Sequence, residues 1–341
     1  MGVSPSLATG DTHGLAVALA PALRTETQMR LSDVQWFRSR WQRGGAATGF
    51  AMWKRSDGRE VEVFVKIPVA YVEYRWTTQL GAVPEEHWDD SWACGLPTAR
   101  VVAHGTRVKG YDLAWIITER LSGKPLAANL DKNAILDIVR SAADFQARAI
   151  RNAPLDACPV NPDWPTIITK SRAIAKLGEI EFALRWKEAL RRVLRALPIL
   201  QNCWRSRPIN AWCHGDLHAG NVIRRNYCDE AGVSRTSCAL VDLALVHPGH
   251  WLEDALYLER QHWGHPEVLD GLKPLSLLAK FRRERNLPVD EHYPQLANLR
   301  RVLMASCAPA MRDREGDRTY LNAALKTLER FLPQVYRECE F

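Results

Sequence analysis

Two acids and one amide in the second half of the chain could carry out metal-assisted chemistry. The segment Cys213–Ile223 reads Cys-His-Gly-Asp-Leu-His-Ala-Gly-Asn-Val-Ile and places Asp216 and Asn221 five positions apart in a polar loop. A second acid, Asp242, directly follows the apolar run Ala239–Val241. Amide and carboxylate oxygens are ligands that Mg²⁺ accepts, and another carboxylate can take the proton of an attacking hydroxyl group. These residues predict phosphoryl transfer from Mg-ATP.

The apolar runs beside these residues predict a hairpin that brings Asn221 and Asp242 together. Val222-Ile223 begins one strand, and the run that ends at Val241 forms the other. Between them, the polar and glycine-containing stretch 226–237 is typical of a long turn. Asp242 would then end one strand where Asn221 begins its partner, so that the two side chains converge.

The segment His214–Asn221 resembles the catalytic loop of the aminoglycoside phosphotransferase and choline kinase-like family, which are small-molecule kinases with the protein-kinase fold. Asp242-Leu243-Ala244 stands where protein kinases have Asp-Phe-Gly. The resemblance implies ATP and Mg²⁺ as cofactors, Asp216 as the catalytic base, and Asn221 and Asp242 as metal ligands. It also implies an α+β, bilobal protein-kinase-like fold with a small antiparallel sheet in the N-lobe and a mostly helical C-lobe.

A glycine-rich turn and a lysine in an apolar strand match the N-lobe of the same family. The small residues of 43–49 leave backbone amides open to phosphate, and Val61–Ile67 alternates and then becomes apolar, as a strand does. Each feature alone is weak, because a glycine-rich turn is usually only a turn and Lys66 could be an edge-strand lysine. By the resemblance, Lys66 contacts the ATP phosphates, and the turn covers them through three residues: Gly44, Gly45 and Thr48.

In this family the lysine pairs with a glutamate on a following helix, and two glutamates are candidates. The segment 84–92 begins with proline and acids, which favour a helix N-terminus, and we therefore predict Glu86 as the partner of Lys66. Glu73 is the alternative. Further on, Glu119 and Leu121 match the family's hinge, in which the backbone binds adenine.

Three more residues are expected to support the catalytic loop. Asp254 matches a later family acid that braces it, and His214 and His218 lie within it. Two histidines four positions apart could share a metal ion on a helix, but Gly215 and Gly220 indicate a loop, and no third ligand cluster lies nearby. Structural hydrogen bonding is therefore the interpretation that we prefer for both histidines.

The sequence predicts a flexible N-terminal arm or a loose helix over 1–30, an N-lobe over 31–120 and a helical C-lobe over 121–341. Cap residues in 32–38 favour a helix. Apolar residues recur at helical spacing from Asn133 onward, and the segment from Trp164 to Trp204 is also mostly helical.

Composition excludes several classes of protein. The chain of 341 residues is 46% hydrophobic and 25% charged, which are globular values, and it contains no apolar run of 18 residues that could span a membrane. The eight cysteines are scattered, so we expect reduced thiols and a cytoplasmic protein. The formal charge of +7 is dispersed and forms no basic stripe with interleaved aromatics, which disfavours nucleic acid as a partner.

The predicted partner is a small-molecule hydroxyl acceptor whose identity the sequence does not specify, and the sequence gives no oligomeric state. The net positive charge argues weakly against a polycationic acceptor. A catalytically weak pseudokinase that only binds nucleotide or ligand is the alternative function. Such proteins usually lose the lysine, the base or the metal ligands, and this chain keeps all four of these residues: Lys66, Asp216, Asn221 and Asp242.

Overall fold

The computed structural model describes residues 12–37, 45–155, 158–159, 161–228, 231–312 and 317–339. The chain divides into two compact units, Met1–Pro125 with Asn221–Val246, and Leu126–Gly220 with His247–Phe341. The expected boundary at 120/121 lies close to the first division. The sequence analysis had left Asn221–Val246 in the C-lobe, whereas its contacts group it with the first unit.

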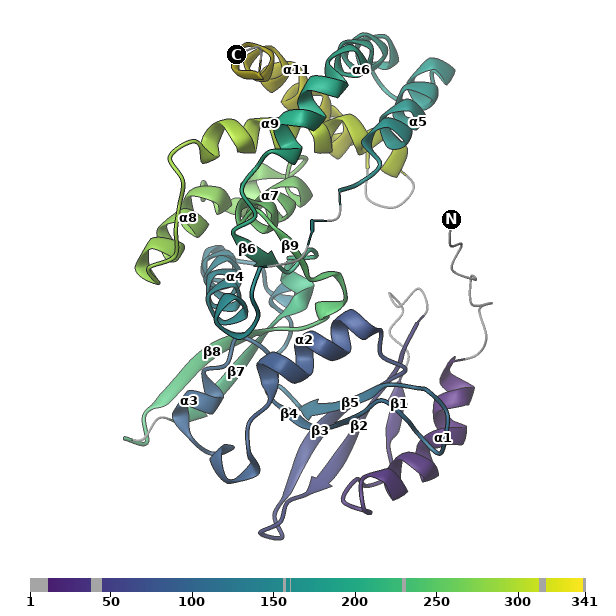
Figure 1. Ribbon diagram of the computed structural model, residues 1–341, viewed down its shortest axis with the longest axis vertical. Coiled ribbons are helices and arrows are strands. Elements are labelled where there is room, and N and C mark those ends of the chain that lie inside the picture. Colours follow the sequence, from purple (N-terminus) through teal and green to yellow (C-terminus); the bar gives the residue numbers. More distant parts are fainter. Residues whose placement is uncertain are drawn as a thin grey trace. The chain divides into compact units, whose positions relative to one another are not determined.

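A five-stranded antiparallel sheet forms the centre of the first unit (Figure 1). In the order in which they pair, its strands are β1 (Gln35–Phe37), β2 (Ala47–Lys54), β3 (Glu60–Ile67), β5 (Trp115–Glu119) and β4 (Val101–Gly105). The helix α2 (Tyr71–Gly81) packs beside β4 and β5. A 3₁₀ turn (Glu85–His87) and the short helix α3 (Ser91–Cys94) follow it.

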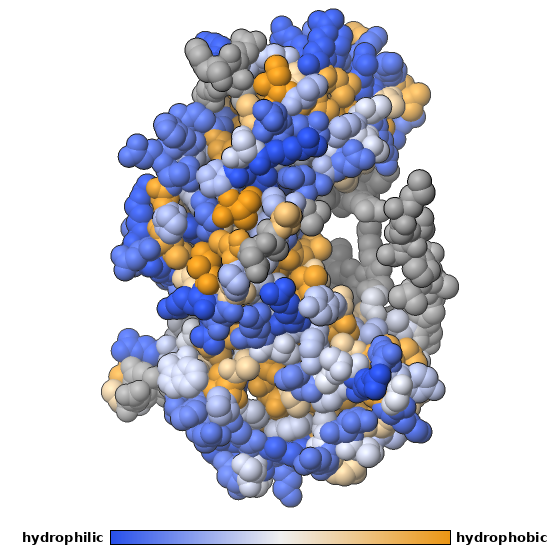
Figure 2. Space-filling view, in the orientation of Figure 1, coloured by the Kyte–Doolittle hydropathy of each residue, from blue (hydrophilic) through white to orange (hydrophobic). Residues whose placement is uncertain are grey.

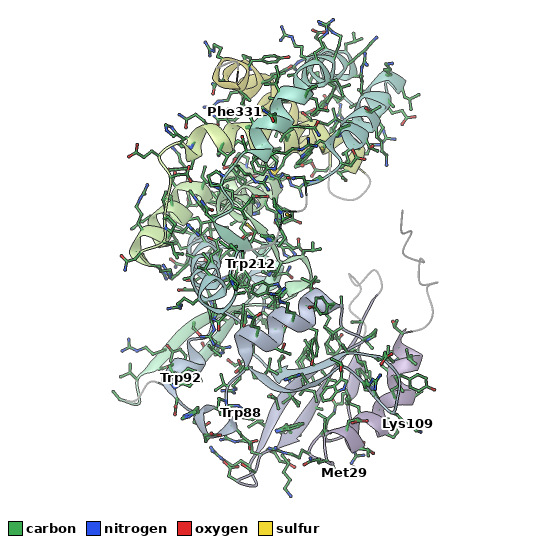
Figure 3. All side chains as sticks on the ribbon, viewed as in Figure 1. Met29, Trp88, Trp92, Lys109, Trp212 and Phe331 are labelled. Atoms are coloured by element: carbon green, nitrogen blue, oxygen red, sulfur yellow. The ribbon has the colours of Figure 1, made fainter. Side chains whose placement is uncertain are left out.

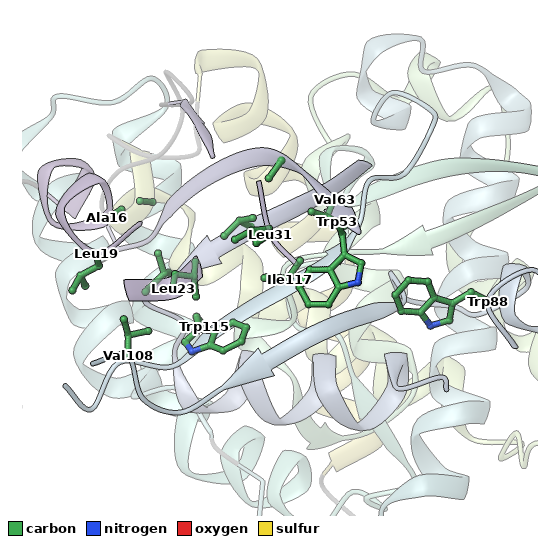
Figure 4. Packing of buried hydrophobic residues seen from close by; sticks show 14 of the residues in the cluster. Ala16, Leu19, Leu23, Leu31, Trp53, Val63, Trp88, Val108, Trp115 and Ile117 are labelled. Carbon is green, nitrogen blue, oxygen red and sulfur yellow. The ribbon is translucent and has the colours of Figure 1, made fainter. Parts of the chain in front are cut away.

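Of the two forms expected over 1–30, a flexible arm or a loose helix, the described part is mostly a helix, and residues 1–11 lie outside the described residues. Residues Thr12–Glu26 form α1, and Ala16, Leu19 and Leu23 on one face of α1 are buried in the hydrophobic core of the first unit. These three residues follow a helical spacing of three and four positions. Figure 4 shows them in the same cluster as Trp53 and Trp115. Full burial of a leucine contributes about 2 kcal/mol, which explains why this segment is ordered.

The helix predicted over 32–38 is also wrong in the described part of that segment. Gln35–Phe37 forms the edge strand β1, in which Gln35 pairs with Phe50 of β2. The hydroxyl of Ser32, which we expected to cap a helix, instead accepts the backbone N–H of Met52 at 2.8 Å. Pairing with the neighbouring strand therefore overrides the local capping pattern.

A second hairpin completes the first unit. Its strands are β7 (Val222–Cys228) and β8 (Ser234–Leu240), which pair from Val222 opposite Leu240 to Cys228 opposite Ser234 (Figure 1). The long turn predicted over 226–237 is therefore mostly strand. The polar residues of this segment are compatible with strand pairing because the end of β8 that follows the turn is exposed to solvent.

Helices dominate the second unit. They are α4 (Lys132–Asn152), α5 (Trp164–Leu177), α6 (Ala183–Arg205), α7 (Leu252–Gln261), α8 (Pro274–Glu284), α9 (Tyr293–Cys307) and α11 (Arg318–Cys339). Asp131 caps α4 by accepting the Ala134 N–H at 2.7 Å, and α5 ends at Gly178, whose φ of +76° a residue with a side chain rarely adopts. Two 3₁₀ turns, Pro266–Leu269 and Ala308–Met311, join later helices.

The helical unit also holds the strand that leads into the loop His214–Asn221. This strand, β6 (Ala211–Cys213), pairs with β9 (His247–Gly249). Trp212 at its centre, labelled in Figure 3, donates its indole N–H to the Ala153 carbonyl at 3.1 Å. The start of the loop is thereby fixed to the end of α4.

Hydrophilic residues cover most of the face seen in Figure 2. Among the described residues, no helix is both long and apolar enough to cross a membrane. The cysteines whose side chains the structure describes are free thiols: Cys94, Cys158, Cys203, Cys213, Cys238 and Cys307.

Candidate active site

Lys66 in the first unit is paired with Glu73, not with the predicted Glu86. The Lys66 ammonium lies 2.5 Å from Glu73 Oε1. Glu73 belongs to the first turn of α2, which begins four residues after β3 ends. Glu86 is exposed on the 3₁₀ turn that follows α2. The prediction failed because the proline and the acids of that segment start a single 3₁₀ turn, whereas α2 has no capping side chain to reveal it.

The Lys66–Glu73 pair is enclosed by protein. The exposed fraction of Glu73 is only 5%, and burial raises its pKa even though the Lys66 charge opposes this shift. The neighbouring Asp242 carboxylate also raises the pKa of Glu73. Glu73 therefore relies on Lys66 to stay ionised, and in return it fixes the position of the ammonium group.

Asn221 and Asp242 lie at the base of the β7–β8 hairpin. The Asn221 carbonyl accepts the N–H of Val241 at 3.0 Å, which sets the two ends of the hairpin side by side. The next residue, Asp242, has a φ of +61°, and its side chain is half exposed. Asp242 Oδ1 is 3.7 Å from Lys66 Nζ. The first unit therefore places two carboxylates and one ammonium in a single group.

The glycine-rich turn is described only in part. Gly44 lies outside the described residues. Gly45 has a φ of +99°, and Thr48 pairs directly with Lys66 across β2 and β3. Gly49 has a structural use, because a Cβ atom there would come within 2.5 Å of the Val34 side chain. The described part of the turn, from Gly45 to Thr48, therefore ends directly beside Lys66 in the sheet.

Glu119 has a structural role that the sequence analysis did not anticipate. Its N–H donates to the Arg100 carbonyl at 2.9 Å, and its carboxylate accepts from Arg225 at 2.5 Å. Arg225 lies on β7, so this ion pair ties the hairpin to the sheet. Leu121 follows β5 and is half-buried. The adenine contacts expected of Glu119 and Leu121 remain predictions.

Asp216 lies in the second unit, where two side chains hold its carboxylate. The Tyr257 hydroxyl donates to Oδ1 at 2.5 Å, and His218 Nε2 is 3.5 Å from Oδ2. The hydrogen bond from His218, followed by that from Tyr257, lowers the pKa of Asp216 to about 2, although partial burial opposes this shift. Asp216 is therefore ionised at neutral pH and is fixed in orientation.

Asp254, at the start of α7, braces the loop that carries Asp216. Its carboxylate oxygens accept the backbone N–H groups of His214 and Gly215, each at 3.0 Å. A third hydrogen bond comes from Gln146 Nε2 at 3.2 Å. Two or three donors on one buried carboxylate make a rigid anchor.

The two loop histidines also use ring nitrogens within the loop. His214 Nδ1 accepts the Asp216 N–H at 3.2 Å, and His218 Nδ1 accepts the Gly220 N–H at 3.0 Å. His214 is fully buried. These contacts fit loop support and do not fit a metal ion shared by the two histidines.

Tyr257 belongs to the candidate site, and the sequence analysis missed it. It lies three positions after Asp254 on α7, so the two side chains share one face of the helix. Once Asp254 was assigned to brace the loop, this spacing could have indicated that Tyr257 also faces the loop. Its hydrogen bond to Asp216 needed the three-dimensional structure.

One more cluster in the second unit has metal-like spacing. Ligand atoms of Cys213, His247 and Glu253 all lie within 4.8 Å of one another. Arg207 Nε is 3.1 Å from Glu253 Oε1, and an Arg300 nitrogen is 3.7 Å from Oε2. Two guanidinium groups already neutralise the carboxylate and would repel a cation, so this cluster is structural.

Comparison with known proteins relates the chain to a large group of enzymes. The model of the phosphotransferase enzyme family matches residues 91–283, which is more than half of the chain. A search of curated protein sequences found no match.

Several solved structures resemble the chain at low sequence identity. A putative aminoglycoside phosphotransferase from Ralstonia eutropha is 15% identical, with 93% of this chain and 98% of that chain covered and a TM-score of 0.52. An aminoglycoside phosphotransferase from Alicyclobacillus acidocaldarius is also 15% identical, covers 92% and 93%, and has a TM-score of 0.49. A spectinomycin phosphotransferase in complex with ADP and spectinomycin is 11% identical, covers 88% and 89%, and has a TM-score of 0.48. The expected protein-kinase-like α+β fold is confirmed.

Proposed function

The chain belongs to the phosphotransferase enzyme family, and from this premise we propose that it transfers the γ-phosphate of Mg-ATP to a hydroxyl group of a small molecule. The observation that carries the proposal is the hydrogen-bonded frame of Asp216. An ionised carboxylate with a pKa of about 2, fixed by Tyr257 and beside His218, suits the orientation of a hydroxyl nucleophile.

The first unit supplies groups that fit a nucleotide with its metal ion. Asn221 and Asp242 offer amide and carboxylate oxygens, the hard ligands that Mg²⁺ prefers, and two carboxylates around one ammonium leave an excess of negative charge. When bound, Mg²⁺ would neutralise charge on the phosphates. Lys66, held by Glu73, positions the phosphates, and the backbone from Gly45 to Thr48 covers them.

The proposed reaction needs little covalent chemistry from the protein. Asp216 orients the acceptor hydroxyl and accepts its proton late in the transfer, when the oxygen–phosphorus bond is forming. Because a carboxylate with a low pKa is a weak base, alignment contributes more than proton removal. A cytoplasmic location, where reduced thiols persist, is part of the proposal.

The test is release of ADP in the presence of Mg²⁺ and a panel of hydroxylated compounds. The panel contains aminoglycosides, macrolides, choline, ethanolamine, hexoses, nucleosides and homoserine. We expect release that depends on one class of acceptor, and loss of magnesium-dependent nucleotide binding in Asp242→Ala. Nucleotide binding without transfer to any acceptor would leave an acceptor outside the panel, whereas absence of both transfer and nucleotide binding would reject the proposal in favour of the pseudokinase alternative.

A further inference from the structure

A relay of three buried polar side chains joins α8, α4 and α7 in the second unit. Its members are Arg282 of α8, Gln146 of α4 and Asp254 of α7, whose exposed fractions are 0%, 0% and 1%. A polar side chain that leaves water must find hydrogen-bond partners within the protein. The contacts of these three residues therefore determine how each side chain is oriented.

Arg282 fixes the orientation of the Gln146 side chain. Arg282 Nη1 donates to Gln146 Oε1 at 2.6 Å, and Nε and Nη2 donate to the Pro288 carbonyl at 3.3 and 3.0 Å. Burial lowers the pKa of Arg282 only to about 10, so the guanidinium is charged at neutral pH and can only donate. The amide oxygen of Gln146 must therefore face Arg282, which turns the amide nitrogen the opposite way.

The amide nitrogen of Gln146 then meets two acceptors at the start of α7. Nε2 donates to the Trp251 carbonyl and to Asp254 Oδ2, each at 3.2 Å. Asp254 Oδ2 also accepts the His214 N–H, and Oδ1 accepts the Gly215 N–H. If the amide were reversed, its oxygen would face a carboxylate and a carbonyl, and its nitrogen would face the guanidinium. Only one orientation of this amide therefore satisfies the relay.

We propose that Arg282 and Gln146 are positioning residues for the reaction: Arg282 orients Gln146, and Gln146 holds the Asp254 carboxylate where it binds the loop. This inference rests on the proposed function, because the loop carries Asp216 directly after the two N–H groups that Asp254 accepts. A carboxylate that loses a donor is free to rotate, and the loop backbone then shifts with it. Small displacements of a reacting group lower the rate steeply.

Three variants and a control test the relay. Gln146→Glu keeps the size of the side chain and an acceptor for Arg282, but it presents an oxygen to Asp254 in place of the donor. Arg282→Met removes the guanidinium, whereas Arg282→Lys keeps the charge and one donor for Gln146. The control, Arg285→Met, breaks another contact between α8 and α4, in which Arg285 Nε donates to Asp144 at 2.7 Å. Thermal unfolding shows which variants fold, and the two conservative changes carry the test if Arg282→Met does not.

Two measurements are made on the full chain. One is the NMR-detected hydrogen exchange of the two loop N–H groups that Asp254 accepts, relative to the buried α9 segment 302–305, which reports opening of the whole helical unit. The other is kcat and KM for Mg-ATP in the acceptor-dependent reaction. We expect Gln146→Glu and Arg282→Met to speed the relative exchange by about tenfold and to lower kcat by about tenfold, with KM nearly unchanged. Arg282→Lys should have a smaller effect and Arg285→Met none.

The outcomes separate this inference from the proposed function. Unchanged relative exchange in the folded variants would overturn the positioning role, and acceptor-dependent turnover would leave the proposed function intact. Faster exchange with unchanged kcat would also overturn it, since Gln146 and Arg282 would then support the loop without positioning the base. If the unmodified protein transfers phosphate to no acceptor and binds no ATP, the proposed function fails, and the positioning role fails with it.

Discussion

The two units each contain a buried carboxylate in an ion pair, and the two pairs differ in how completely they are balanced. Glu73 is 5% exposed and Glu253 is 7% exposed. One ammonium group, Lys66, serves both Glu73 and Asp242. Two guanidinium groups, those of Arg207 and Arg300, serve the single carboxylate of Glu253.

The pKa values follow this difference. Burial raises the pKa of Glu73, and one lysine does not fully offset it. Burial also acts to raise the pKa of Glu253, but the hydrogen bond from His247 and the charges of Arg300 and Arg207 lower it to about 2. A group with surplus negative charge is suited to receive a metal ion and its phosphates, whereas the fully compensated pair is suited to hold the fold.

The largest predicted effect is on the fold, through Glu253→Gln. Removal of this charge leaves two buried guanidinium groups without their counter-ion, so the free energy of unfolding should fall by about 3–5 kcal/mol. Denaturant titration measures the change, and Glu267→Gln, at an exposed glutamate, is the control. A loss as small as that of the control would mean that the pair does not hold the second unit together.

The same pair predicts a dependence of stability on pH. Because the folded pKa of Glu253, about 2, lies below its ordinary value of 4.5, its contribution is present above pH 4.5 and is lost as the pH falls toward 2. Denaturant titrations between these pH values should show a smaller decline for Glu253→Gln than for the unmodified protein. If stability declined equally in the two proteins, groups other than Glu253 would account for the loss of stability in acid.

Lys66→Met should have the opposite profile, with a large effect on turnover and little on the fold. Loss of a cation that positions phosphate should lower kcat/KM by roughly 10²–10³-fold. Stability should change little because Glu73, whose pKa is already raised, can take up a proton. Lys54→Met, at the exposed end of β2, is the control. A severe loss of stability in Lys66→Met would remove the contrast between the two pairs.

Substitutions at Glu73 and Glu86 should differ in their effect on turnover, and this difference should be smaller than the effect of Lys66→Met. Glu73→Gln keeps the shape of the side chain but weakens its hold on Lys66, so turnover should fall by about tenfold. Glu86→Gln should leave turnover unchanged, since Glu86 is exposed and lies outside the pair. Steady-state kinetics of the two variants would contradict the structure if Glu86→Gln were the more damaging.

The smallest effect is expected for Tyr257→Phe. This change removes one hydrogen bond to Asp216 and should lower kcat/KM by a few-fold, which corresponds to about 1 kcal/mol. It should also raise the pKa of Asp216 above about 2, so the acid limb of the pH–rate profile should move to higher pH. A reduced rate without this movement would show that Tyr257 acts only through packing.

The parts of the site that are continuous in sequence were predictable. The loop His214–Asn221, the later acid Asp242 and the strand that carries Lys66 each combine fixed spacing with a clear apolar pattern. Their residue types and their local structure agree, so the pattern of residues predicts where they lie, and their roles in the reaction remain predictions.

The errors occurred where tertiary contacts decide the outcome. Glu86 follows a better helix-start pattern than Glu73, but the partner of Lys66 is chosen by where α2 packs. Ser32 suggested a cap and instead bonds a neighbouring strand. The hydrogen bond from Tyr257 to Asp216 joins residues 41 positions apart, and no local pattern specifies such a contact.

Asp216→Asn tests the central claim most directly. The measurement compares acceptor-dependent ADP release and Mg-ATP affinity in this variant and in the unmodified protein. The account predicts that turnover falls by at least about 10²–10⁴-fold while affinity for Mg-ATP stays nearly the same, because the proposed nucleotide-binding residues belong to the first unit and the proposed base to the second. Equal losses of turnover and of Mg-ATP affinity, or turnover that persists, would contradict the role of Asp216 as the base.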